Sequence, residues 1–199
     1  MGASSNPLLT VDVQLRRHRF SVEAYDEMVA QGILTSDDRV ELLAGDILEM
    51  APIGSRHAAF VSRLGRLLTL ALHEHAIVRV QSPVALPPDS QPEPDIAIVR
   101  PREDFYARSH PRAGDVLLLI EVADSSLTLD RTVKEPLYAA AGIAELWIVD
   151  LRAEAIAVCA KPECGTYTER SIGRREATLT PTAFPEVTVR VQEILFQDG

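Results

Sequence analysis

The stretch Asp115-Val-Leu-Leu-Leu-Ile-Glu-Val-Ala123 is the most apolar strand-like segment of the chain. Its five consecutive aliphatic residues, 116–120, predict a strand covered on both faces and therefore central in a sheet. Glu121 follows directly after them. A carboxylate near a core is costly unless a cation, hydrogen-bond donors or a raised pKa compensates it. The segment therefore predicts both a buried sheet and a candidate functional acid.

A second acid begins another predicted strand. Asp95 follows Pro94 and opens the short apolar run 95–99. If the strands 95–99 and 115–123 are neighbours, Asp95 and Glu121 converge at one edge of the sheet. Two carboxylates aimed at one point form a hard-oxygen site suited to Mg²⁺, with Mn²⁺ as an alternative. The competing interpretation is that each acid is a strand-end residue that reaches solvent.

Lys134 is the third candidate. The chain has 18 arginines and only two lysines, Lys134 and Lys161, and an arginine cannot reproduce the compact ammonium of a lysine. Lys134 lies thirteen residues after Glu121, where a polar segment meets a predicted helix. A carboxylate–metal–lysine site is suited to phosphodiester hydrolysis, because the lysine orients the attacking water or neutralises developing charge. The alternative is a surface cation.

The rest of the sequence predicts one mixed sheet flanked by helices. Ser21 is the expected N-cap of a helix that ends before Gly32, and apolar residues recur every 3.6 positions from 55 to 75. The other predicted elements are a hairpin at 39–50, a strand at 77–81, an extended loop at 83–94, loops at 100–114 and 124–133, a helix at 135–141, a strand at 146–150, a hairpin of 155–159 with 166–168, and a tail at 187–195 that alternates and then becomes helical.

This order is typical of a mixed α/β or α+β fold with an N-terminal helix and hairpin. We expect residues 1–20 to form a loose lead-in and residues 21–199 to form a single domain, since 199 residues suit one domain.

Composition excludes several classes of protein. Apolar residues make up 46% of the chain and charged residues 25%, as in soluble globular proteins. A net charge of −9 argues against nonspecific coating of nucleic acid, although a nuclease remains compatible with it. The sequence shows no membrane span, secretory signal or glycine-rich phosphate loop. We therefore expect a cytoplasmic protein without an organic cofactor.

Several blocks resemble one known family. They are Arg39-Val-Glu-Leu-Leu-Ala-Gly-Asp-Ile, His57, Glu93-Pro-Asp-Ile, Ile120-Glu-Val-Ala-Asp-Ser-Ser, Asp130-Arg-Thr-Val-Lys134 and Tyr138-Ala-Ala-Ala-Gly-Ile-Ala-Glu-Leu-Trp-Ile-Val-Asp150. Together they resemble the Uma-type putative restriction endonucleases of the PD-(D/E)XK nuclease superfamily. The likeness covers roughly residues 21–167, and the block that begins at Tyr138 is the most distinctive.

The resemblance implies a restriction endonuclease-like core and a Mg²⁺-dependent endonuclease of DNA. Asp95 and Glu121 would be its catalytic acids and metal ligands, with Glu41 completing the metal shell. His57 would contact metal or phosphate, and Arg131 is a candidate substrate contact. The substrate would be DNA, the products would carry 5′-phosphate and 3′-hydroxyl ends, and a homodimer would help to cut both strands.

The sequence departs from the superfamily pattern in one respect. The usual lysine position, two residues after the second acid, is Ala123 here. The resemblance to the family implies that the lysine has moved to the following helix, which points to Lys134. Pro136 then predicts a helix that starts near Glu135 and leaves Lys134 at its mouth.

Two other classes of function stay open, because a fold does not fix a function. One is a non-catalytic dimeric binding or regulatory protein with a degraded site, and the other is a hydrolase of a smaller phosphoester. A cleft that is acidic throughout would argue against access by DNA.

Overall fold

Strand β5 (Val116–Ala123) is an inner strand of a six-stranded sheet with the order β3-β4-β5-β6-β7-β8. The computed structural model describes residues 17–35 and 37–195. β5 pairs with β6 in parallel, whereas every other pair of neighbours in this sheet is antiparallel. β4 and β5 are neighbours, which meets the condition under which Asp95 and Glu121 converge. The other strands of the sheet are β3 (Ile77–Val80), β4 (Ile96–Val99), β6 (Glu145–Asp150), β7 (Ala155–Glu163) and β8 (Thr166–Arg174).

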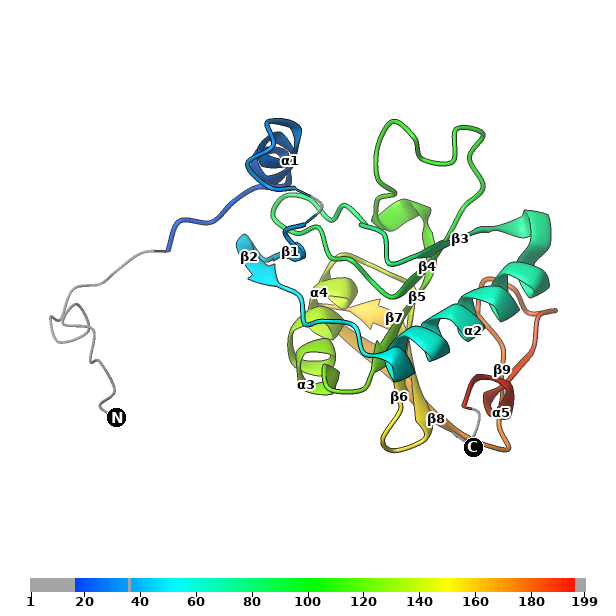
Figure 1. Ribbon diagram of the computed structural model, residues 1–199. Coiled ribbons are helices and arrows are strands. Elements are labelled where there is room, and N and C mark those ends of the chain that lie inside the picture. The colour runs from blue at the N-terminus through cyan, green and yellow to red at the C-terminus, as the bar shows by residue number, and fades with distance from the viewer. Residues whose placement is uncertain (1–16, 36, 196–199) are drawn as a thin grey trace, which may run out of the picture.

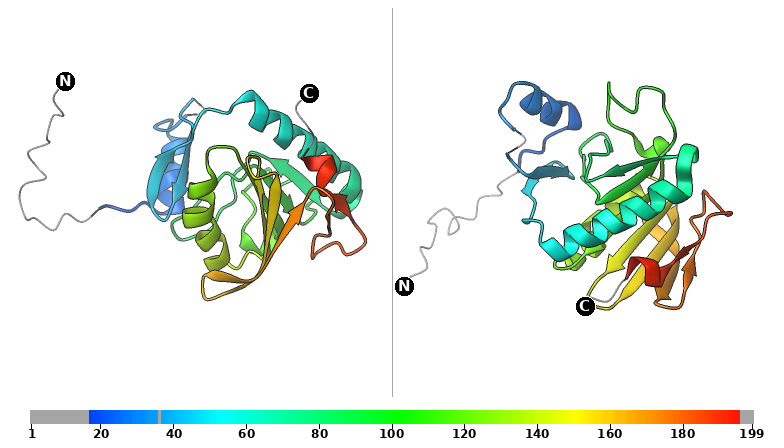
Figure 2. Two further views of the ribbon diagram at one scale, coloured as in Figure 1. Left: turned by 90° about the horizontal axis from the view of Figure 1, so that it is seen from below. Right: turned by 45° about the vertical axis from the view of Figure 1, so that its right-hand side comes forward.

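Helices cover both faces of this sheet (Figure 2). Helix α2 (Ser55–Leu72) and the C-terminal segment pack on one face, where Leu64, Leu68 and Trp147 are fully buried. Helices α3 (Leu127–Leu129) and α4 (Glu135–Ala140) pack on the other face. The C-terminal segment contains β9 (Thr178–Leu179), β10 (Val189–Arg190) and α5 (Val191–Ile194), and short 3₁₀ turns lie at His73–His75 and Ala113–Asp115.

The alternation of β5 explains where its acid points. Leu118, Ile120 and Val122 belong to the core under α2, so Leu119 and Glu121 face the side of α4.

The N-terminal elements lie beside the sheet (Figure 1). Helix α1 (Val22–Ala30) begins where predicted, because the Ser21 hydroxyl accepts a hydrogen bond of 3.2 Å from the N–H of Ala24. The predicted hairpin is β1 (Val40–Leu43) with β2 (Asp46–Glu49). Of the expected lead-in 1–20, residues 1–16 lie outside the described residues.

The expected loop at 124–133 is wrong over most of its length. The chain is helical from α3 through a π-helical turn (Asp130–Lys134) into α4. In the wider turn the N–H of Glu135 bonds to the carbonyl of Asp130, five residues earlier. Pro136 has no N–H to donate and lies in the first turn of α4, where it is tolerated. Lys134 therefore lies inside a continuous helical segment and not at its mouth.

None of the helices within residues 17–35 and 37–195 is long and apolar enough to cross a membrane.

Candidate active site

A cavity of about 360 Å³ opens between the β1–β2 hairpin, the start of α2, the ends of β4 and β5, and the helical segment that contains Lys134. The sequence elements that line it are far apart in the chain and meet only in the folded protein. The polar residues that line it are Arg39, Glu41, Glu49, His57, Gln81, Glu93, Asp95, Glu121, Asp124, Ser125, Ser126, Asp130 and Lys134.

Strand register brings the two predicted acids together. Ile96 pairs with Ile120 across the antiparallel β4–β5 ladder, so the next position along the ladder sets Asp95 opposite Glu121. The N–H of Asp95 lies 3.5 Å from Glu121 Oε2, and Asp95 Oδ2 accepts a hydrogen bond of 2.8 Å from the N–H of Val122. The backbone therefore fixes both carboxyl groups at the same edge of the sheet.

Lys134 enters the site from the helical segment. Its Nζ lies 3.1 Å from Glu41 Oε2 and 3.4 Å from Glu121 Oε1. All three side chains are buried. Burial by itself lowers the pKa of Lys134, but the carboxylates of Glu121 and Glu41 outweigh this effect and raise it. The lysine is therefore a charged ammonium at neutral pH.

Glu41 is the contribution of the hairpin. It lies on β1, only 3% exposed, and its Oε2 also accepts a hydrogen bond of 3.1 Å from the N–H of Glu93. That bond ties the hairpin to the segment that leads into Asp95.

His57 lies in the first turn of α2 and contacts Asp95. Its Nε2 is 2.8 Å from Asp95 Oδ1, and Gln81 Nε2 lies 3.4 Å from the same oxygen. The hydrogen bond to Asp95 raises the pKa of His57 above its ordinary value, although burial opposes the shift. His57 and Gln81 thus hold Oδ1 of Asp95, while β5 holds its Oδ2.

Glu121 has the most perturbed acidity among these carboxyl groups. Burial raises its pKa to about 8, while Lys134 and a hydrogen bond from Tyr138 lower it. The phenol of Tyr138 donates that bond to Glu121 Oε1 over 2.6 Å, and Tyr138 is fully buried in α4. A carboxyl group with a raised pKa in a cavity is typical of functional sites.

Tyr138 had no predicted role, although it opens the most distinctive block of the sequence. Glu93 and Asp130 were also missed as parts of the site. Both line the cavity, and burial raises the pKa of each. The one available signal for Glu93 was its place two residues before Asp95.

Arg131 is not brought into the cavity. Its guanidinium lies 3.7 Å from Asp150 Oδ2 at the end of β6 and is about half exposed. Asp130 and Lys134 line the cavity from this helical turn, whereas Arg131 lies with Thr132 and Val133 on its exposed side.

The lining of the cavity is strongly acidic. Among the described residues that line it, seven are acidic, and the basic ones are Arg39, Lys134 and His57. This charge attracts cations and opposes a polyanion unless cations accompany it.

The donor set suits a hard divalent cation, because carboxylate oxygens of three separate elements point into one acidic cavity. As the side chains stand, however, no three acid, histidine or cysteine groups within the described part of the chain are arranged to hold an ion. Lys134 lies between Glu41 and Glu121, and His57 engages Asp95. The residues fit a metal by their chemistry, and binding would require side chains to turn toward it.

Comparison with known proteins agrees with this fold. The family described as "Uma2: Putative restriction endonuclease" matches residues 22–192, and the chain belongs to this family. A solved structure of a putative nuclease of the DUF820 group from Anabaena variabilis ATCC 29413 is similar, with a TM-score of 0.71. It is 14% identical in sequence, and the match covers 88% of this chain and 97% of that one. No curated protein matches the chain.

Proposed function

We propose that the protein is a metal-dependent DNA endonuclease. The observation that carries the proposal is the meeting of Glu41, Asp95, Glu121 and Lys134 in one cavity. Three carboxylates and an ammonium from four elements form the set of groups that phosphodiester hydrolysis uses. Membership of a family described by nuclease activity supports the same reaction class.

The carboxylates of Asp95 and Glu121, together with Glu41, would hold Mg²⁺ or Mn²⁺. When bound, such an ion polarises a phosphate and lowers the pKa of a coordinated water. Tyr138 orients Glu121, and the N–H of Val122 orients Asp95, so both ligands start from fixed positions.

Lys134 has the role of a charged donor in this proposal. Because its pKa is raised, it keeps its protons at neutral pH and cannot act as a general base. Its ammonium instead holds the attacking water by a hydrogen bond and neutralises charge that develops on the phosphate. His57 keeps Asp95 in position at the mouth of the cavity, where a phosphate would enter.

The expected products are 5′-phosphate and 3′-hydroxyl ends. A homodimer would present one cavity to each strand of a DNA duplex. Light scattering in solution measures whether the protein is a dimer.

The acidic lining favours a second candidate function, a non-catalytic binding or regulatory protein on a nuclease fold. In that case Lys134 is a structural counter-ion that stays paired with Glu41 and Glu121, and no metal ion takes its place.

Plasmid cleavage with Mg²⁺ or Mn²⁺ separates the two candidates. We expect the wild type to nick or cut, and Asp95→Asn and Lys134→Ala to lose at least a hundredfold in rate. Lys161→Ala is the matched control, because Lys161 is the other lysine of the sequence and lies two-thirds exposed on β7. Equal cutting by all four proteins would identify a contaminant and end the assignment.

A further inference from the structure

The loop of residues 100–112 joins β4 to β5 at the ends opposite Asp95 and Glu121, and it projects from the sheet (green in Figure 1). Four of its thirteen residues are arginines, against two acids, Glu103 and Asp104. In a chain with a net charge of −9 this is a local excess of positive charge. The four arginines are Arg100, Arg102, Arg108 and Arg112.

An internal network holds the loop in one shape. The Tyr106 hydroxyl donates a hydrogen bond of 2.9 Å to the carbonyl of Arg100, and the guanidinium of Arg102 lies 4.0 Å from the centre of the Tyr106 ring. Asp104 accepts hydrogen bonds from Arg102 and from the N–H of Tyr106. The side chains inside the loop are therefore used to fix its backbone.

Phe105 is the exception, because the same network leaves it outside. Its side chain is 69% exposed, while the ring of Tyr106 beside it is buried. Both residues have positive φ angles, 50° and 63°, which cost non-glycine residues on the order of 1 kcal/mol or more. The fold thus holds the exposed aromatic ring of Phe105 on a basic loop, although the exposure of the ring and the positive φ angle are both unfavourable.

The partner that uses both features is a nucleic acid. Guanidinium groups match phosphate oxygens, and an exposed aromatic ring stacks on a base or wedges between two bases. An acidic protein surface would satisfy the arginines but offers no regular partner for Phe105. Glu23 and Asp26 of α1 line a cavity of about 390 Å³ with Arg108 and Arg112, so contacts to phosphate would fall on the outer sides of these exposed arginines.

We propose that the loop 100–112 is a DNA-contacting arm, in which Arg108 and Arg112 bind backbone phosphates and Phe105 stacks on a base. The inference rests on the proposed function, since it names where the DNA of that reaction is held. Arg100 lies five residues beyond Asp95, about 17 Å along a strand, which is the length of about five base pairs. This separation is within the length of a short duplex, and the arm would supply the positive charge that the cavity lacks.

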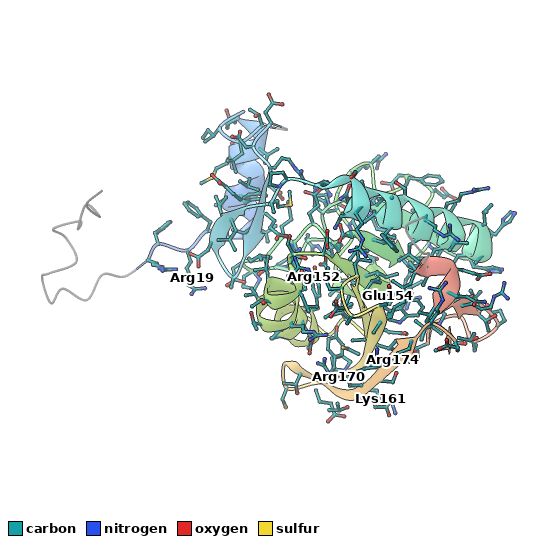
Figure 3. All side chains as sticks on the ribbon, turned by 60° about the horizontal axis from the view of Figure 1, so that its bottom comes forward. Arg19, Arg152, Glu154, Lys161, Arg170 and Arg174 are labelled. Atoms are coloured by element: carbon teal, nitrogen blue, oxygen red, sulfur yellow. The ribbon has the colours of Figure 1, made fainter. Side chains whose placement is uncertain are left out.

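Fluorescence anisotropy of a labelled 20-base-pair duplex in EDTA tests the arm without cleavage. We expect the double variant Arg108→Gln/Arg112→Gln to bind about tenfold more weakly. The slope of log K against log salt concentration should also become shallower by about two, one for each lost phosphate contact. Phe105→Ala should weaken binding about tenfold and leave the salt dependence unchanged. The matched controls are Arg174→Gln (Arg174 is labelled in Figure 3) and Ile172→Ala. Both residues lie on β8, at the far edge of the sheet from β3, and Ile172 is 63% exposed.

The proposal is wrong if the Arg108→Gln/Arg112→Gln and Phe105→Ala variants both bind the duplex as tightly as the wild type does. It is also wrong if the wild type binds no duplex DNA. Loss of binding to duplex RNA but not to duplex DNA also overturns it. Plasmid cleavage separates this failure from failure of the nuclease proposal. If the wild type cuts plasmid DNA and the arm variants bind normally, only the arm proposal is wrong. If the arm variants lose binding but the wild type never cuts, the arm proposal is supported and the nuclease proposal is wrong. Thermal unfolding verifies that each variant is folded, and Arg108→Gln alone replaces the double variant if that one is not.

Discussion

Lys134 Nζ lies 3.1 Å from Glu41 Oε2, although the two residues are 93 positions apart in sequence and come from a helix and a hairpin. Both side chains are buried, and Glu121 is the second partner of the same ammonium. The ion pairs of Lys134 link the N-terminal hairpin to the sheet, so stability and the proposed chemistry depend on the same group.

Replacement of Lys134 by alanine should destabilise the protein by about 3–5 kcal/mol, because it leaves two buried carboxyl groups without their cation. Chemical denaturation followed by circular dichroism measures this loss. Lys161→Ala should leave the stability unchanged, because its ion pair with Glu169 is exposed to solvent. Similar losses in the two variants would contradict the structural role of Lys134.

Divalent-ion binding should strengthen as pH rises from 6 to 8. The pKa of Glu121 is raised to about 8, so below that value its proton competes with the ion, and above it the competition ends. Isothermal titration with Mn²⁺ should show affinity that rises by up to about tenfold per pH unit and then levels off. In Glu121→Gln this part of the pH dependence should disappear. An affinity that is flat with pH in the wild type would remove Glu121 from the ligand set.

Removal of one hydroxyl, in Tyr138→Phe, should weaken the site without dismantling it. The lost hydrogen bond to Glu121 normally lowers the pKa of that carboxyl group, so the rise of Mn²⁺ affinity should move to higher pH. The variant should also lose about 1–3 kcal/mol of stability, because a buried acceptor loses its donor.

Tyr167→Phe is the matched control for that change. Tyr167 is also buried, but its hydroxyl has no hydrogen-bond partner among the described residues, so its loss should leave stability and ion binding unchanged. A pH profile that moves equally in the two variants would contradict the role of Tyr138.

Glu145 should matter for stability and not for the site. Its carboxylate accepts hydrogen bonds of 2.6 Å from the indole N–H of Trp147 and from the N–H of Thr182, which joins the C-terminal segment to β6. Glu145→Ala should cost about 2–4 kcal/mol, since two donors lose their acceptor. Glu154→Ala, at the exposed β6–β7 turn, should be neutral (Figure 3). Thermal unfolding together with limited proteolysis of the C-terminal segment checks both, and unchanged proteolysis would contradict the link.

Much of the fold could be predicted because its signals are local. The N-cap at Ser21, the 3.6-residue period of α2 and the apolar run of β5 all act within a few residues, and each element lies where these patterns place it. The helical turns at 127–134 were missed for the same reason. Their residues are mostly polar and show no helical apolar period, and the buried side chains of the π-helical turn are the charged Asp130 and Lys134.

For the site, the sequence by itself determined which side chains are chemically unusual. It marked an acid after five aliphatic residues, an acid that opens a strand, and a lysine in a chain that otherwise uses arginine. Only the tertiary structure decided that they meet. Strand register sets Asp95 opposite Glu121, and the helical path from 127 to 140 turns Lys134 inward and Arg131 outward. These are contacts between distant segments, which no local pattern encodes because their energy exists only after the chain has packed.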